Sequence, residues 1–201
     1  MTWKRLRKCL KQFRNQAEYD LKLKELNDLL LLEKEGFIKI YYGDESGFSL
    51  TPNVPYGWQP KGQYIGIPSQ KSTPTNVFGL LSRDNQFEAY TVNGSMDGAC
   101  LSAFIDDFAQ QITQPTVIVL DNAPFHHSKI MQQKIEQWKL IDLRIWFLPT
   151  YSPHLNIIET LWRKIKYEWL KHYHYKDQKT LTAALEEILK NIGTEYTIEF
   201  K

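Results

Sequence analysis

The stretch TVIVLDN, residues 116–122, decides how the rest of the sequence is interpreted. Its first five residues form an apolar, β-branched run, which is typical of a strand covered on both faces. The run ends abruptly at Asp121. Strands of this kind occur in sheets flanked by helices, where functional side chains lie at the carboxyl ends of strands. The stretch therefore predicts an α/β fold with a candidate functional carboxylate at Asp121.

The residues before this run predict a meander of three strands followed by a helix. FIKIYYG, residues 37–43, is rich in β-branched and aromatic side chains and leads to Asp44 and Glu45, with Gly47 beginning a turn. The segments NVFGLLSR and QFEAYTV alternate around a turn at 83–85 and predict antiparallel strands. Apolar residues at helical spacing over 97–111 predict a helix.

The residues after the run predict helix, strand and two helices. The segments are SKIMQQKIEQWKL at 128–140, LRIWFL at 143–148, NIIETLWRKIKYEWLK at 156–171, and a final helix over about 180–191. A long N-terminal helix ends at Glu35, with Gly36 as its stop signal. This order predicts a five-stranded mixed sheet flanked by helices, with parallel crossovers in its second half.

Composition excludes several classes of protein. With 201 residues and 42% hydrophobic residues, the chain is large enough to bury a core. A net charge of +2 is too balanced for a disordered tail or a histone-like polycation. The two cysteines, Cys9 and Cys100, exclude a disulfide framework and a thiolate zinc site. No apolar run approaches the ~20 residues of a membrane span.

Three acidic residues are candidates for one site: Asp44, Asp121 and Glu159. Each also has an ordinary structural interpretation, because acids at strand ends often cap turns. Glu159 stands three residues after Asn156, the spacing of a capping box. If the three carboxylates met at one edge of the sheet, they would repel one another unless a divalent cation lay between them. Oxygen ligands favour Mg²⁺ or Mn²⁺.

Two basic stretches are candidates for contact with phosphates, and a solvated helix face is the alternative for both. The opening residues carry Lys4, Arg5, Arg7, Lys8, Lys11 and Arg14 before the first acid, Glu18. After Glu159 come Arg163, Lys164, Lys166 and Lys171, interleaved with aromatic residues. Helical spacing places Trp162, Ile165 and Trp169 on a common face that is expected to join the core. Trp58 either anchors its loop or stacks on a base.

Three segments carry a resemblance to a known family. They are IYYGDESGFSLTPNVPYGWQPKGQ at 40–63, VIVLDNAPFHHS at 117–128 and IWFLPTYSPHLNIIETLWRKIK at 145–166. These resemble the motif blocks of IS630-type transposases, in the IS630/Tc1/mariner group of DDE enzymes. The start, MTWKRLRKCLK, resembles the family's segment just after its DNA-binding region. The resemblance implies an RNase H-like catalytic domain at 37–201, preceded by a basic helix or linker at 1–36.

The resemblance also implies a site and an activity. Asp44, Asp121 and Glu159 become the catalytic, metal-binding triad for two Mg²⁺ or Mn²⁺ ions, supported by Asn122, His126 and Asn156. Asp44, and not Glu45, matches the first acid of the family. Neighbouring strand residues point to opposite faces, so the two cannot serve equally. The implied reaction is cleavage of double-stranded DNA at transposon ends, followed by strand transfer into target DNA at TA sites. The resemblance also implies a homodimer on DNA. Its implied location is the bacterial cytoplasm, in association with the nucleoid.

Some features depart from the family pattern. The family commonly has proline where Ile157 stands and an acid where His154 stands. Helix-turn-helix units typically precede this region, so the chain is expected to be the catalytic half of a transposase, with end recognition on a separate half. His126 either orients water or phosphate, or is a packed side chain; His127 is a weaker candidate. The alternative functions are another RNase H-fold nuclease and a non-catalytic remnant that binds DNA or a partner.

Overall fold

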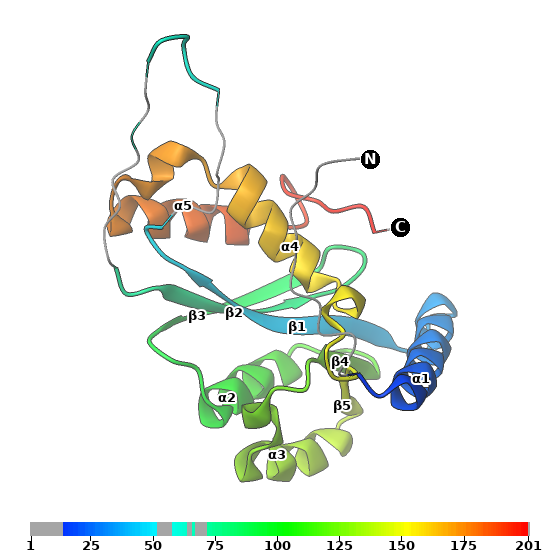
Figure 1. The fold of residues 1–201 in the computed structure, drawn as a ribbon. Helices are drawn as coiled ribbons and strands as arrows, with labels where there is room; N and C mark the ends of the chain where they lie inside the picture. Colours follow the sequence, from blue (N-terminus) through cyan, green and yellow to red (C-terminus); the bar gives the residue numbers. More distant parts are fainter. Residues whose placement is uncertain (1–13, 52–57, 64–65, 67–71, 201) are drawn as a thin grey trace, which may run out of the picture.

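The computed structural model describes residues 14–51, 58–63, 66 and 72–200. A five-stranded mixed sheet in the order β3-β2-β1-β4-β5 runs through its middle (Figure 1). The strands are β1 (Lys39–Phe48), β2 (Thr75–Leu81), β3 (Phe87–Asn93), β4 (Thr116–Leu120) and β5 (Leu143–Phe147). The first three form an antiparallel meander, whereas β4 and β5 join β1 in parallel.

Helices cover both faces of this sheet. They are α1 (Gln16–Lys34), α2 (Gly98–Ala109), α3 (Lys129–Lys139), α4 (Ile158–Lys164) and α5 (Gln178–Lys190). Short helical segments are η2 (Pro124–His127), η3 (Pro153–Leu155), the π-helical η4 (Ile165–Trp169) and η5 (His172–Lys176). In Figure 1, α4 and α5 lie on one face of the sheet, and α2 and α3 lie on the other.

Strand alternation divides the buried side chains into two cores. Ile40 and Tyr42 of β1 join Val119 of β4 in the core beneath α4 and α5. Ile118 and Leu120 of β4 belong to the core against α2 and α3. All five residues are fully buried or nearly so. The continuous apolar run of β4 is thus explained by its central position, with a helix layer on either side.

The predicted fold class and order of elements are confirmed, and the sheet with its helices has the RNase H-like architecture. Side-chain caps explain several helix starts: Asp97, Ser128 and Asp177 each accept a hydrogen bond from a backbone amide of the helix that follows. The predicted helical stop at Gly36 is borne out by its φ of +80°. The basic residues of positions 1–13 lie outside the described residues.

Two predicted boundaries were wrong. Strand β1 does not stop before Asp44 but continues to Phe48, because Tyr42 to Phe48 pair with β2. Gly47 is therefore a strand residue, and pairing with a neighbouring strand outweighs its preference for turns. The helix predicted over 156–171 begins at Ile158 and changes to π-helical geometry at Ile165. Within the described residues, no helix combines the length and apolar character that a membrane span requires.

Candidate active site

Two of the three predicted acids lie side by side on neighbouring parallel strands. Tyr42 of β1 is paired with Val119 of β4, so two residues further along each strand Asp44 lies beside Asp121. Both share the strand parity of Tyr42 and Val119, which face α4 and α5. Asp44 is within a strand rather than at its end, but it lies just beyond the part of β1 that pairs with β4. The carboxyl end of β4 therefore lies at an edge of the sheet that carries Asp44 and Asp121, which we call the acidic edge.

The third acid, Glu159, is in the first turn of α4, which packs on this same face. The approach of α4 depends on Gly79 of β2, the strand partner of Asp44. A Cβ atom at Gly79 would lie 2.8 Å from atoms of both Trp162 and Phe87. Trp162 fills this space, one turn after Glu159, and is buried. The missing side chain in β2 thus lets α4 come close enough to bring Glu159 toward Asp44.

Asn156 fixes the start of this helix to β1. Its side-chain Nδ2 donates to the Gly43 carbonyl at 3.1 Å, and the residue is 4% exposed. The capping-box interpretation of Glu159 is therefore wrong, because the Asn156 side chain bonds to β1 and α4 begins after Ile157 without a side-chain cap. A backbone amide of Glu159 still reaches the Asn156 carbonyl. Asn156 acts as a link between the third motif block and the first.

The electrostatics of the acids differ strongly. Burial, with the nearby charges of Glu159 and Glu45, raises the pKa of Asp44 to about 8. Burial also raises the pKa of Glu159. The charge of Lys166 opposes this shift, and the charge of Asp121 adds to it. Asp121 behaves in the opposite way, since a hydrogen bond from His126 lowers its pKa. At this edge, therefore, Asp121 ionises easily, whereas the pKa values of Asp44 and Glu159 are raised.

His126 is buried between two acids from different elements. Its Nδ1 lies 3.0 Å from Asp121 Oδ1 and 2.9 Å from the Asp121 carbonyl, and its Nε2 lies 3.4 Å from Glu45 Oε1. Burial opposes protonation of the ring, but the hydrogen bonds to Asp121 and Glu45 outweigh it and raise the pKa of His126 to about 9. Glu45 thus contacts His126, as its position on the opposite face from Asp44 allows. The sequence contains no signal that pairs two residues 81 positions apart.

The neighbouring polar residues have different surroundings. Asn122 is exposed directly after Asp121, and its Oδ1 contacts Nε2 of His127. The His127 ring also packs on Phe147, with ring centroids 4.5 Å apart. His127, which the sequence marked as a weak candidate, therefore orients Asn122 rather than a carboxylate.

The donor set fits a hard divalent cation in its chemistry. All three acids offer oxygen ligands. Burial and the like charges of Glu159 and Glu45 raise the pKa of Asp44 to about 8, so a cation at the edge would favour its ionised form. Among the described residues, however, no three acidic, histidine or cysteine side chains already stand close enough to share one ion. The fold brings the ligand candidates to one edge without closing them into a finished coordination shell.

The predicted basic residues divide into three groups. Lys166 is half-buried at the acidic edge, 5.2 Å from the Phe48 ring centroid; burial lowers its pKa while the charges of Glu159 and Asp44 oppose that effect. Lys164 forms a 2.6 Å ion pair with Glu168, and Arg163 is exposed. The remaining predicted contacts lie outside the described residues: Lys4, Arg5, Arg7, Lys8 and Lys11.

The aromatic residues near the motif blocks also divide. Trp162 and Ile165 are buried and Trp169 packs against the same core, as the helical spacing predicted. Trp58 was expected to be a packed loop anchor or a stacking side chain, and it is fully exposed. The packed alternative for Trp58 is therefore wrong.

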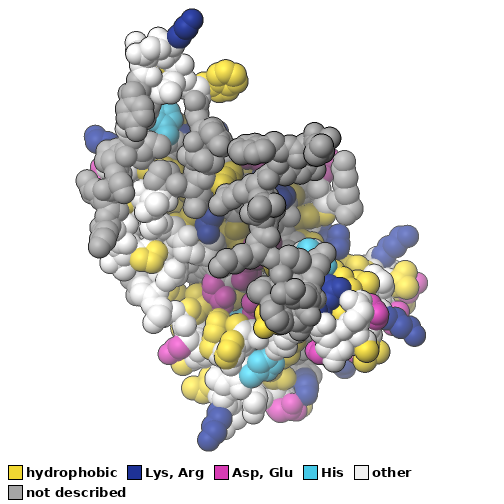
Figure 2. All heavy atoms as spheres, in the orientation of Figure 1, with side chains coloured by type: hydrophobic (Ala, Val, Ile, Leu, Met, Phe, Trp, Pro, Cys, Tyr) yellow, Lys and Arg dark blue, Asp and Glu magenta, His cyan; other side chains and the backbone are white. Residues whose placement is uncertain are grey.

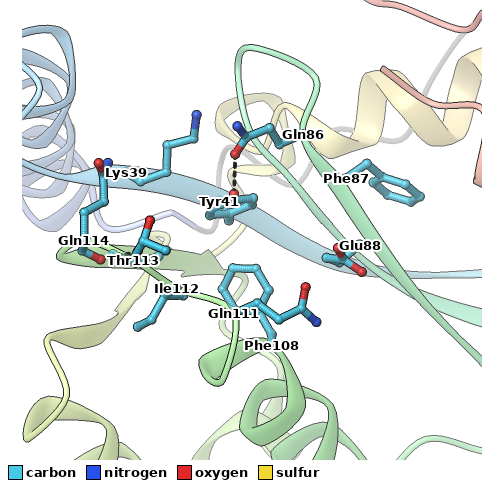
Figure 3. A pocket seen from close by; sticks show the side chains of 11 residues that line it. Lys39, Tyr41, Gln86, Phe87, Glu88, Phe108, Gln111, Ile112, Thr113 and Gln114 are labelled. Carbon is cyan, nitrogen blue, oxygen red and sulfur yellow. Dashed lines mark hydrogen bonds between the residues drawn. The ribbon is translucent and has the colours of Figure 1, made fainter. Parts of the chain in front are cut away.

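The space-filling view shows acidic side chains gathered near the middle of one face, at the level of the sheet (Figure 2). A pocket of about 350 Å³ lies elsewhere, at the starts of β1 and β4, where Tyr41 and Phe108 form part of its lining (Figure 3). In that pocket Tyr41 donates a 2.6 Å hydrogen bond to Gln86. The pocket shares no lining residue with the acidic edge.

Comparison with known families and structures agrees with this geometry. Residues 39–182 match the family described as DDE superfamily endonuclease. The chain belongs to this family of endonucleases. Comparison with curated protein sequences finds no significant match.

Solved structures with the same fold include transposases and a retroviral integrase. The Mos1 strand transfer complex superposes with a TM-score of 0.62 at 14% identity, over 94% of this chain and 58% of that chain. The Mos1 mariner paired end complex with Mn gives 0.63 at 15% identity, over 94% and 60%. The catalytic core domain of BIV integrase gives 0.52 at 14% identity, over 80% and 86%. The chain thus spans about three fifths of the Mos1 chains.

Proposed function

We propose that the chain is the catalytic domain of an IS630-type transposase, which cuts double-stranded DNA at transposon ends and joins the freed 3′-hydroxyl to target DNA at TA sites. The observation that carries the proposal is that Asp44 of β1 lies beside Asp121, which directly follows the parallel neighbour β4, beneath the helix that carries Glu159. In this division, residues 37–201 perform the chemistry and residues 1–36 link it to the part that recognises DNA.

Asp44, Asp121 and Glu159 would hold two Mg²⁺ or Mn²⁺ ions. When bound, the ions would activate the attacking water or 3′-hydroxyl and stabilise the leaving oxygen. Support comes from the crowding of carboxylates at the edge, where burial and like charge raise the pKa of Asp44 to about 8. The Mos1 paired end complex, which shares the fold, has been solved both with Mn and with Mg.

The residues around the acids would bind and orient DNA. Lys166 lies near the acids, since the charges of both Glu159 and Asp44 act on it, and it would contact the phosphate beside the scissile bond. Arg163 and Lys164 extend the positive charge along α4. Asn122, oriented by His127, is a further donor beside Asp121. Asn156 holds the Glu159 helix in place through Gly43.

The N-terminal basic segment is proposed to approach the same DNA. Tyr19 near the start of α1 shares a 3.1 Å hydrogen bond with His154, five residues before Glu159, and Arg14 lies over the Tyr19 ring. The start of α1 is thereby fixed beside the third motif block. Lys4, Arg5, Arg7, Lys8 and Lys11 precede it in the chain, so we propose that they bind phosphates flanking the cleavage site.

End recognition and pairing of two ends would require further components. We propose that a homodimer acts on DNA, together with a helix-turn-helix half, at the bacterial nucleoid. The Mos1 transposase, which shares the fold, has been solved as a paired-end complex with the left transposon end. An assembly that pairs two ends is therefore compatible with a catalytic domain of this architecture.

The test uses DNA carrying the inverted repeats that flank the gene, with Mn²⁺ and target plasmid. We expect cleavage at the repeat ends and joined products at TA sites, with both lost in Asp121→Asn. Cleavage without joined products would favour a different RNase H-fold nuclease. Absence of cleavage with the helix-turn-helix half present would favour a non-catalytic remnant.

A matched pair of variants tests the DNA contact. Lys166→Met keeps the apolar stem and removes the charge, so we expect roughly tenfold weaker binding of a cleaved-end duplex and a smaller salt dependence of the affinity. Lys179→Met, at an exposed position of α5, is the control, because it removes the same charge away from the acidic edge. Equal effects of the two variants would contradict a specific role for Lys166.

A further inference from the structure

The second acid of β1, Glu45, has no role in the proposed metal site, yet it points at the residue that holds Asp121. Its Oε1 lies 3.4 Å from Nε2 of His126, whose ring is 1% exposed. The other ring nitrogen, Nδ1, lies 3.0 Å from Asp121 Oδ1 and 2.9 Å from the Asp121 carbonyl. One imidazole ring therefore connects β1 to the end of β4 on the face opposite Asp44.

The elements around this ring restrict its movement. Segment η2 begins with Pro124, and the His126 amide donates to the Ala123 carbonyl at 3.0 Å. The Phe125 ring contacts the imidazole with centroids 4.2 Å apart. Helix α2 packs on η2 so closely that a Cβ atom at Gly98 would lie 2.2 Å from Ser128 Oγ. Packing around η2 therefore restricts the His126 ring in addition to its hydrogen bonds.

The two carboxylate oxygens of Asp121 have different surroundings. Oδ1 accepts from the Ala123 amide at 3.0 Å and lies 3.0 Å from His126 Nδ1. In the described part of the chain, no donor contacts Oδ2. Partners of metal-binding carboxylates commonly fix which oxygen faces the ion, and their loss weakens metal binding.

We propose that Glu45 and His126 form a positioning pair for Asp121. Glu45 fixes the His126 ring, and Nδ1 of that ring holds Oδ1 of Asp121, so that Oδ2 is presented to a divalent cation. The role of this pair in catalysis rests on the proposed function. Its role in orienting the carboxylate rests on the contacts of the three side chains alone.

Four variants separate the two ends of the ring. His126→Asn places an amide nitrogen near the position of Nδ1, and His126→Gln places one near Nε2. Glu45→Gln keeps an oxygen acceptor for the ring, and Glu45→Ala removes it. Glu136→Gln on α3, an exposed acid paired with Lys139, is the matched control. Thermal melting of each variant confirms that it is folded.

The first readout is Mn²⁺ affinity measured by calorimetry without DNA. We expect His126→Gln to weaken Mn²⁺ binding about tenfold. Glu45→Ala and His126→Asn each lose the Glu45 contact but keep a donor for Asp121 Oδ1, so both should weaken binding less, about threefold, while Glu45→Gln stays close to the wild type. Equal losses in His126→Asn and His126→Gln, or unchanged affinity in Glu45→Ala, would overturn the proposal. A wild-type chain that binds no Mn²⁺ at millimolar concentration would overturn it too.

The second readout is the ¹⁵N spectrum of the His126 ring in metal-free protein. Glu45→Ala is expected to shift the Nε2 resonance, and Asp121→Asn the Nδ1 resonance, with the control unchanged. A ring that responds to neither substitution contradicts the pair.

DNA cleavage then separates the two proposals. If Asp121→Asn abolishes cleavage while His126→Gln cleaves like the wild type at every Mn²⁺ concentration, the pair fails and the transposase proposal stands. If no form cleaves DNA but the Mn²⁺ order holds, the pair stands and the transposase proposal fails.

Discussion

Charged side chains at the start of strand β1 and in its second half have opposite surroundings. At the start, Lys39 forms a 2.6 Å ion pair with Asp84 of the β2–β3 turn. In the second half, Asp44 is half-buried, and Glu159 and Glu45 act on it as like charges. The first arrangement stabilises the fold and the second opposes it. The sheet pairs opposite charges at Lys39 but places like charges around Asp44. Unfavourable electrostatics of this kind are typical of a functional site.

Removing a carboxylate at the acidic edge is expected to have the largest effect. Asp121→Asn or Asp44→Asn should reduce cleavage of transposon-end DNA by roughly 1,000-fold or more, because each removes an anionic metal ligand with little change in shape. The matched variant Asp84→Asn makes the same change beside Lys39, at the start of β1, and should leave cleavage unaltered. A gel assay with end-labelled DNA in Mn²⁺ measures all three variants. Similar losses in all three would mean that the two regions do not differ in function.

The sequence predicted one part of this comparison well. Asp44 and Asp121 were candidates because each follows an apolar run, Glu159 was the third candidate acid, and the resemblance to IS630-type transposases implied that the three act as one triad. The pair Glu45 and His126 was not predictable, because it depends on the register of β1 and on the path of η2. The extent of β1 was missed for a related reason. Gly47 favours a turn locally, but its pairing with Asn76 in β2 decides its conformation.

The stability of the metal-free chain should depend on pH through Asp44, in the second half of β1. Folding raises the pKa of Asp44 to about 8 from its ordinary value of 3.8. Between these values the folded chain keeps a proton that the unfolded chain has lost, so stability falls as pH rises from about 4 to 8, by up to ~1.4 kcal/mol per pH unit.

Thermal melts in EDTA at pH 5.5 and pH 8 measure this effect. Asp44→Asn cannot ionise and should lose less stability than the wild type between the two pH values, a difference of up to ~3 kcal/mol. Adding Mn²⁺ at pH 8 should stabilise the wild type more than the variant. Parallel pH profiles for the two proteins would show that Asp44 is not held in a repulsive site.

Gly79→Ala is expected to act on the packing beside the acids. The added Cβ would lie 2.8 Å from atoms of Trp162 and Phe87, so α4 must shift or the rings must turn. Overpacking of this kind costs about 1–3 kcal/mol, measured by urea unfolding. Because Glu159 moves with α4, cleavage should fall as well in protein that remains folded. Gly62→Ala is the comparison variant: its φ of +82° strains an L side chain, but the added Cβ meets nothing within 4 Å, so it should lower stability without lowering cleavage.

The smallest effect is expected where the charges are paired. Burial opposes ionisation of Asp84, but hydrogen bonds from Lys39 and Ser82 outweigh it and lower its pKa. This pair therefore stabilises the fold above the ordinary pKa of an aspartate and loses that contribution as pH falls through the lowered value. The Asp84 side chain is 56% exposed, so solvent screens the pair and its loss should cost less than ~1 kcal/mol. Urea unfolding of Asp84→Asn, Lys39→Met and the double variant isolates the coupling, which should shrink in 1 M NaCl. A coupling above about 2 kcal/mol would mean that the start of β1 also depends on a desolvated charge. The contrast with Asp44 would then lie in the sign of the interaction and not in its strength.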